Sequence, residues 1–200
     1  MSIIKQSEYL HVKGLHCHIG TNIRDVHQFE SMAISLANTV TSLKMEHQIE
    51  LEWLDVGGGL AGISPRLDEE QLAPFPLPSI NKYLNAIIGP LNSTLKDNDL
   101  TLYFEPGRTI FEPFGALVTK VIGHRDSHYC QGIICDAGIN FLPTSHTYNH
   151  PIHAMHKQGL PYPTFVFGPT CNQQDQLYQK AMIPKLNNGE LLLFYGVGAY

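Results

Sequence analysis

The sequence has few of the features that mark several large classes of protein. Its 200 residues carry a formal net charge of -5, and the 13 Lys and Arg form no cluster that could neutralise a run of nucleic-acid phosphates. No apolar run approaches the ~20 residues of a membrane span, and residues 1–8 lack the basic and apolar segments of a secretory signal. Only four cysteines are present, without C-x-x-C spacing. We therefore expect a globular cytoplasmic protein with free thiols, whose partners are neither nucleic acid nor membrane.

The first half of the chain alternates strand and helix signals. Apolar runs at 10–18, 51–56 and 100–104 predict strands. Between them, apolar residues at steps of three and four predict one helix after Asp25 and another after Ser79, with these two residues as N-caps. Strand–helix repeats of this length are typical of βα units in a parallel sheet.

The pattern changes after about residue 112. Short strand-like runs, separated by Gly, Pro and Asn with no helical stripe between them, lie at 116–122, 132–135, 164–167 and 191–195. We therefore predict an α/β domain over residues 1–112 and a mostly β domain over residues 113–200.

A glycine run follows the second predicted strand. Gly57 to Gly62 satisfies G-x-G-x-x-G, but a dinucleotide site requires a helix to begin at those glycines. Prolines at 65, 74, 76 and 78 interrupt the segment that follows, which argues against that helix. Two interpretations remain open: a nest of backbone N–H groups for a phosphate, or a tight turn without a ligand.

The third predicted strand ends at Glu105-Pro106-Gly107-Arg108. The carboxyl ends of strands carry the active sites of α/β barrels. A carboxylate and a guanidinium three residues apart can form a simple ion pair. Alternatively, Arg108 holds a phosphate while Glu105 pairs with a protonated ring nitrogen.

His16 and His18 lie on one face of the first predicted strand, an arrangement found in metal-dependent hydrolases. Such a site needs ligands at later strand ends, where Asp55 and Asp136 are the only candidates and no histidine follows in the first half. Four further histidines (His146, His150, His153 and His156) are more typical of a polar loop. We therefore assign no metal.

Cys171 follows the Gly168-Pro169-Thr170 turn. A lone cysteine is commonly a small buried apolar residue, whereas one beside a Gly-Pro turn can be exposed and reactive. The sequence leaves both interpretations open.

Taken in order, these motifs resemble one family. The segments that carry the resemblance are Gly14-Leu15-His16-Cys17-His18-Ile19-Gly20-Thr21, Leu54-Asp55-Val56-Gly57-Gly58-Gly59, Glu105-Pro106-Gly107-Arg108, Asp136-Ala137-Gly138, Gly168-Pro169-Thr170-Cys171 with Asp175, and Gly198-Ala199-Tyr200. The chain resembles the fold-type III pyridoxal-phosphate decarboxylases, the group of ornithine and diaminopimelate decarboxylases, from about residue 10 to residue 200. The resemblance implies the C-terminal part of a (β/α)8 barrel followed by a mostly β domain. It also implies pyridoxal 5'-phosphate as cofactor, an amino-acid substrate, and a homodimer with shared active sites.

The resemblance assigns a role to individual residues. It implies that His18 stacks on the cofactor ring, that Glu105 bonds the pyridine nitrogen, and that Cys171 is the acid that protonates the substrate carbon in the neighbouring subunit. The other implied cofactor contacts, chiefly to the phosphate, are Thr21, Gly57, Gly58, Gly59, Gly107, Arg108 and Tyr200. The implied substrate contacts are Asn149, Asn172 and Asp175.

The sequence departs from the family in two respects. None of its nine lysines matches the Lys that holds the cofactor as an aldimine, so we expect a C-terminal portion of such an enzyme with little turnover on its own. Diamine-forming members place acids where Asn149 and Asn172 stand, and diaminopimelate-type members place an Arg within 139–145, where none occurs. We therefore expect a substrate other than free ornithine, lysine or diaminopimelate, such as an amino-acid conjugate.

Two other functions compete with decarboxylation. One is a non-catalytic or split-gene relative that binds a partner subunit, which the missing Lys favours. The other is the metal-dependent hydrolase on a barrel, which depends on His16 and His18 alone and leaves Glu105, Arg108 and Cys171 without a use.

Overall fold

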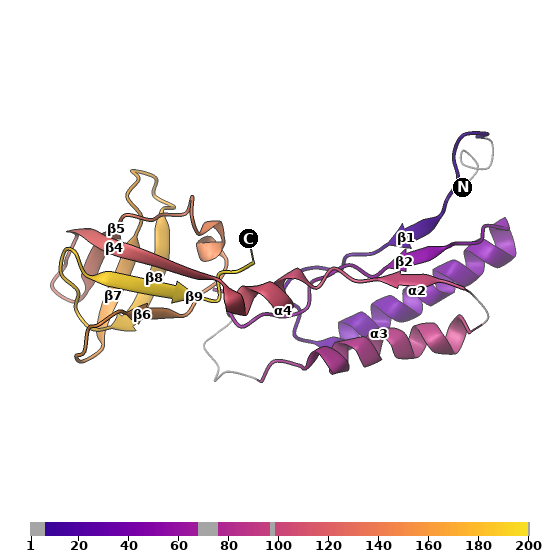
Figure 1. Ribbon diagram of the computed structural model, residues 1–200, viewed down its shortest axis with the longest axis horizontal. Coiled ribbons are helices and arrows are strands. Elements are labelled where there is room, and N and C mark those ends of the chain that lie inside the picture. The colour runs from indigo at the N-terminus through magenta and orange to yellow at the C-terminus, as the bar shows by residue number, and fades with distance from the viewer. Residues whose placement is uncertain (1–6, 68–75, 97–98, 200) are drawn as a thin grey trace. The chain divides into compact units, whose positions relative to one another are not determined.

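The computed structural model describes residues 7–67, 76–96 and 99–199 (Figure 1). The chain divides into two compact units, one comprising Met1–Ala61 with Pro76–Thr109 and the other Gly62–Phe75 with Ile110–Tyr200. The described residues 62–67 therefore go with the second unit. The contiguous division between residues 112 and 113 stays a prediction.

The first unit is a parallel sheet with helices packed on it (Figure 1). Strands β1 (Gly14–His16), β2 (Trp53–Asp55) and β3 (Thr101–Tyr103) lie side by side in that order. The predicted strands are all present, and each is shorter than its apolar run. Because side chains alternate along a strand, the central residue of each faces the helices and its two neighbours face the other way. Leu54, for example, is fully buried in the core beneath the helices.

The two predicted helices are α2 (Val26–His47) and α3 (Ile80–Thr94). The side chain of Asp25 accepts a hydrogen bond from the backbone N–H of His27, so the predicted cap of α2 is confirmed. Ser79 stands at the N-cap position of α3, but its side chain makes no capping bond. The apolar stripe that predicted α2 is its buried face: Phe29, Met32, Ala33, Leu36, Ala37, Val40 and Leu43.

The second unit is built on a six-stranded sheet (Figure 1). Its strands are β4 (Ala116–His124), β5 (Gln131–Cys135), β6 (Ile152–Ala154), β7 (Tyr162–Phe167), β8 (Gln176–Ile183) and β9 (Leu191–Tyr195), in the order β6-β9-β4-β5-β7-β8. All neighbours are antiparallel except β5 and β7. The edge strands β6 and β8 contact each other, so the sheet curls towards closure. The remaining elements are short: α4 (Gly107–Phe111) and the 3-10 turns Glu112–Phe114 and Pro143–His146.

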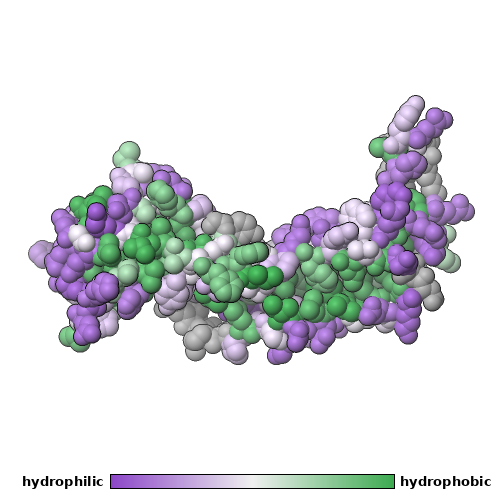
Figure 2. All heavy atoms as spheres, viewed as in Figure 1, coloured by the Kyte–Doolittle hydropathy of each residue, from purple (hydrophilic) through white to green (hydrophobic). Residues whose placement is uncertain are grey.

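Figure 2 shows apolar side chains reaching the displayed face of both units. Large apolar residues exposed on the strands of the second unit include Val118 and Ile122 of β4 and Met182 of β8. Scattered exposure of this kind is common in folded proteins, and it identifies no partner. None of the described helices combines the length and the apolar character needed to cross a membrane.

Candidate active site

The segments that follow β1, β2 and β3 continue the pairing of the strands. The backbone N–H of Cys17 donates to the Asp55 carbonyl at 2.9 Å, and that of Val56 donates to the Tyr103 carbonyl at 3.0 Å. Beyond these, the N–H of Glu105 donates to the Gly57 carbonyl at 2.9 Å. The parallel register therefore brings the His-Cys-His, Gly-Gly-Gly and Glu-Pro-Gly-Arg motifs to one edge of the sheet.

The glycine run is required by the close approach of these segments. A Cβ at Gly58 would collide with the carbonyl oxygen of Glu105, and one at Gly59 would collide with the carbonyl oxygen of Gly20. Gly57 and Gly59 also have φ of +66° and +84°, which glycine adopts without strain. No helix begins within residues 57–67, so the structure gives no support to a dinucleotide site.

Two backbone N–H groups of the run already have partners. The Gly57 N–H donates to Oδ1 of Asp55 at 2.9 Å, and the Gly58 N–H donates to Nδ1 of His18 at 3.3 Å. Packing therefore accounts for the glycines whether or not a phosphate binds. The phosphate contacts assigned to this run stay predictions.

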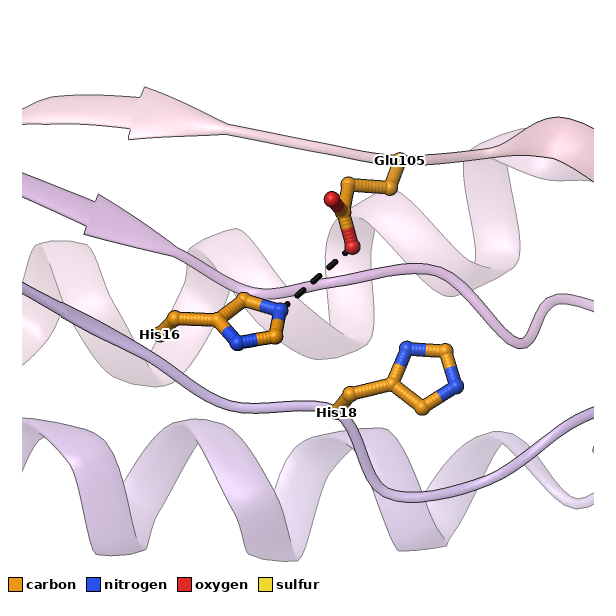
Figure 3. Close-up of side chains that lie close together, drawn as sticks. All are labelled: His16, His18 and Glu105. Carbon is orange, nitrogen blue, oxygen red and sulfur yellow. Dashed lines mark ion pairs between the residues drawn. The ribbon is translucent and has the colours of Figure 1, made fainter.

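His16, His18 and Glu105 project from these segments towards one another (Figure 3). Nε2 of His16 lies 3.4 Å from Oε2 of Glu105, and each of the two side chains is about half exposed. The possible ligand atoms of all three residues lie within 4.8 Å of one another. Glu105 is thus a third possible ligand beside the two histidines. The sequence did not indicate it, because the His-Cys-His and Glu-Pro-Gly-Arg motifs are far apart in the chain.

The hydrogen bond of His18 determines what this cluster offers a ligand. Because Nδ1 accepts the Gly58 N–H, the proton of the neutral imidazole lies on Nε2. A protonated nitrogen does not bind a metal ion, so the cluster in this tautomer suits an organic ring better than a cation. The half-exposed carboxylate of Glu105, which pairs with His16 here, can instead face a protonated ring nitrogen.

Three other residues assigned to the cofactor, Arg108, Gly107 and Thr21, lie in the same unit. Arg108 is in the first turn of α4, directly beyond Glu105, and its side chain is buried. Gly107 begins that helix, and Thr21 is exposed in the segment before α2. Tyr200 lies outside the described residues.

The second unit carries the residues assigned to the substrate. Cys171 and Asn172 are exposed in the loop between β7 and β8, which decides against a buried apolar role for Cys171. All four cysteines are free, as predicted. Asn149 is half-buried and its backbone N–H donates to the Pro65 carbonyl, whereas Asp175 is buried.

A hollow of about 530 Å³ lies beside the Cys171 loop. Six of its eight lining residues are polar and none is acidic: Gln173, Gln174, Gln176, Gln179, Ser145, His146, Ile139 and Pro143. Sequence reasoning missed this hollow, because its lining comes from two stretches far apart in the chain, 139–146 and 173–179.

Sequence reasoning also missed a buried histidine. His150 lies between Thr144 Oγ1, 2.8 Å from its Nε2, and the Gly196 carbonyl, 2.9 Å from its Nδ1. The histidines at 146, 150, 153 and 156 form no metal-type cluster among the described residues. His150 is therefore a buried residue that links Thr144 to the Gly196 backbone within the second unit, and not part of an exposed polar loop.

Comparison with known proteins agrees with this geometry. Residues 1–112 match the family model described as "Pyridoxal-dependent decarboxylase, pyridoxal binding domain". The chain belongs to the pyridoxal-dependent decarboxylase family. The matched segment includes the His18, Gly57–Gly59 and Glu105 motifs, and the cofactor of the family is pyridoxal 5'-phosphate.

Curated relatives cover this chain almost completely. The diaminopimelate decarboxylase of Aquifex aeolicus is 31% identical over 196 residues, 96% of this chain and 44% of the relative. That of Helicobacter pylori (strain 26695) is 32% identical over 200 residues, 98% of this chain and 46% of the relative. The chain thus spans less than half the length of these relatives.

Solved structures confirm the predicted fold class. The diaminopimelate decarboxylase of Helicobacter pylori complexed with L-lysine superposes with a TM-score of 0.78 at 29% identity, covering 100% of this chain and 47% of that one. The enzyme from Methanocaldococcus jannaschii gives a TM-score of 0.82 at 27% identity, covering 100% and 45%. The α/β part and the β domain therefore have the fold of the corresponding parts of these decarboxylases, and the comparisons favour neither the hydrolase nor the non-catalytic alternative.

Proposed function

We propose that this chain serves the pyridoxal-phosphate-dependent decarboxylation of an amino acid or amino-acid conjugate. The observation that carries the proposal is the gathering of the His18 imidazole, the Glu105 carboxylate and the Gly57–Gly59 loop at the carboxyl ends of three parallel strands. These groups fit the cofactor: His18 is a ring to stack, Glu105 is a carboxylate for a ring nitrogen, and Arg108, three residues further on, is a guanidinium for a phosphate.

Each residue has a defined task in this proposal. When bound, the cofactor supplies a ring that delocalises the electron pair left at Cα as CO2 departs. Glu105 holds a proton at the pyridine nitrogen, and His18 covers one face of the ring. Arg108 and Thr21 hold the phosphate. The exposed thiol of Cys171 delivers a proton to Cα across the interface of a homodimer.

The substrate class follows from the side chains that the second unit offers a substrate, since the one assigned carboxylate, Asp175, is buried and bonded within its own chain. Asn149 and Asn172 are amides, and the hollow beside the loop carries no acidic side chain. Burying a distal ammonium without a counter-charge costs on the order of several kcal/mol. We therefore propose a substrate whose distal end is neutral, and we propose that the enzyme is cytoplasmic. Efficient turnover of free ornithine by the full-length protein would contradict the proposed substrate class.

Binding of the cofactor can be followed through the single tryptophan of the chain. Trp53 lies on β2 and packs edge-to-face against Tyr103, in the same unit as Glu105. We expect saturable quenching of its fluorescence by pyridoxal phosphate. Loss of a charge-assisted hydrogen bond in Glu105→Gln should weaken binding about tenfold.

Glu30→Gln is the matched control, because it makes the same change on the exposed face of α2 beside His27. Equal affinity of the two variants, or no saturable quenching of the parent chain, would contradict the proposal. Borohydride reduction followed by intact mass then distinguishes two binding modes. We expect no covalent adduct, and a stable adduct at one lysine would show that the chain holds the cofactor as an aldimine by itself.

A further inference from the structure

The loop between β7 and β8, residues 168–175, is organised around a buried carboxylate. Asp175 is only 2% exposed, and burial of a carboxylate is costly unless it accepts hydrogen bonds. Its Oδ1 accepts from the Ile139 N–H at 2.8 Å, and its Oδ2 accepts from the Thr170 N–H at 2.9 Å and from the Thr170 hydroxyl at 2.6 Å. Burial acts to raise the pKa of Asp175, but these bonds outweigh it and hold the pKa below its usual value.

Two glycines make room for this carboxylate. A Cβ at Gly168 or at Gly138 would collide with the carboxylate oxygens of Asp175. Neither glycine adopts a left-handed φ, so backbone conformation does not explain them. The carboxylate therefore packs between the Asp-Ala-Gly turn after β5 and the start of the Gly-Pro-Thr-Cys loop.

Backbone bonds close the loop on itself. The Gly168 N–H donates to the Asp175 carbonyl at 2.9 Å, and the Asp175 N–H donates to the Asn172 carbonyl at 3.0 Å. Cys171 thus stands between Thr170, which is bonded twice to the carboxylate, and Asn172, whose carbonyl accepts from Asp175. Because Cys171 is itself exposed, the position of its thiol depends on these bonds and not on packing.

We propose that Asp175 is a positioning residue, which fixes the Cys171 loop to the turn at Gly138–Ile139 and so presents the thiol in one place. The proposal deepens the proposed function, since it depends on the role given there to Cys171. Sequence reasoning placed Asp175 among the substrate contacts, whereas its carboxylate is buried and occupied by three donors of its own chain.

Amide hydrogen exchange of the 200-residue chain tests the positioning directly. In Asp175→Asn the side chain keeps its size but loses its charge and one acceptor oxygen. We expect the amides of Ile139, Gly168, Thr170 and Asn172 to exchange at least tenfold faster, with the amides of β4 and β9 little changed. Asp126→Asn is the control, because Asp126 also accepts a backbone N–H in this unit, from Gly132, but at an exposed site.

Gly168→Ala gives an independent test. The added methyl should speed exchange of the same loop amides when Asp175 is present, and should add little when Asp175→Ser has removed the carboxylate. An equal effect in both backgrounds would show that the glycine does not accommodate the carboxylate. Uniformly faster exchange throughout the sheet, or no change at Ile139 and Thr170, would also overturn the proposal.

Thiol alkylation separates positioning from loss of structure. Burial raises the pKa of Cys135 to about 12, so this thiol reacts at neutral pH only if the unit opens. In Asp175→Asn we expect an altered pH profile of iodoacetamide labelling at Cys171 while Cys135 stays unlabelled. Labelling of both would indicate a merely structural role. None of these measurements uses pyridoxal phosphate, so they can fail while cofactor binding succeeds, and the reverse.

Discussion

Replacing Gly58 by alanine should force apart two backbone segments of the first unit. Gly58 is buried, and a Cβ there would overlap the carbonyl oxygen of Glu105. A backbone oxygen cannot turn aside as a flexible side chain does, so the segment that carries Glu105 must shift as a whole. The φ of Gly58 is not left-handed, so alanine adds no backbone strain of its own.

The loss of stability in Gly58→Ala can be estimated from its contact with the Glu105 carbonyl. Overpacking of a buried site costs about 1–3 kcal/mol, and the smaller backbone entropy of an unfolded alanine returns about 0.4–1 kcal/mol. A net loss of about 1–2 kcal/mol lowers the melting temperature of a chain of this size by about 2–8 °C. Because Glu105 moves with its carbonyl, the affinity for pyridoxal phosphate should also fall.

Gly89→Ala is the matched control. Gly89 lies within α3 of the same unit, and apart from its chain neighbours a Cβ there meets no atom within 4 Å. Alanine is the better helix former by about 0.8–1.0 kcal/mol, but a Cβ directly before Pro90 is disfavoured in a helix. The two effects oppose each other, so this variant should unfold close to the parent. Trp53 fluorescence can report both urea unfolding and cofactor binding. The reasoning would be refuted if Gly58→Ala unfolded at the parent's urea concentration, or if it lost stability without losing affinity.

Two further predictions concern stability. Hydrogen bonds lower the pKa of Asp136, chiefly one from the Lys120 N–H, and those to Asp175 outweigh its burial. Their stabilisation is therefore complete above the usual carboxyl pKa of about 4 and is lost as the pH falls further; the urea midpoint should drop between pH 5 and pH 3, and less steeply in Asp175→Asn. Phe29→Ala should cost about 3–5 kcal/mol, because Phe29 is fully buried and packs edge-to-face on Tyr83; an unfolding free energy within 1 kcal/mol of the parent would contradict it.

The parts of the fold that the sequence predicted are those with a strong periodic signal. The apolar stripe of the 22-residue helix α2 repeats from Phe29 to Leu43, which identifies its buried face. Strand β8 was missed because its register with β7 shifts twice, between Thr164 and Val166 and between Val166 and Phe167. Those shifts break the regular alternation of buried and exposed residues by which a strand is recognised. Strand β6 has only three residues, too few to show a period.

The candidate site was also predicted only in part. Resemblance to the family singled out His18 and Glu105, and the parallel register brings them to one edge. The ion pair of Glu105 with His16 could not be predicted, because nothing in either motif specifies which side chains meet across β2. The burial of Asp175 was hidden for a similar reason. Its three donors belong to Ile139 and Thr170, and only the packing of the loop on the turn brings them together.

The packing of the Gly57–Gly59 run requires glycine whether or not this edge of the sheet binds a phosphate. Close contacts with the Glu105 and Gly20 carbonyls require small residues at Gly58 and Gly59 even in a protein that binds no phosphate. The N–H groups of Gly57 and Gly58 are moreover engaged by Asp55 and His18. A phosphate at this edge must therefore share those donors or depend on Arg108 and its other neighbours. The glycines position the carboxylate, and in the proposed function it is the carboxylate with His18 that faces the cofactor.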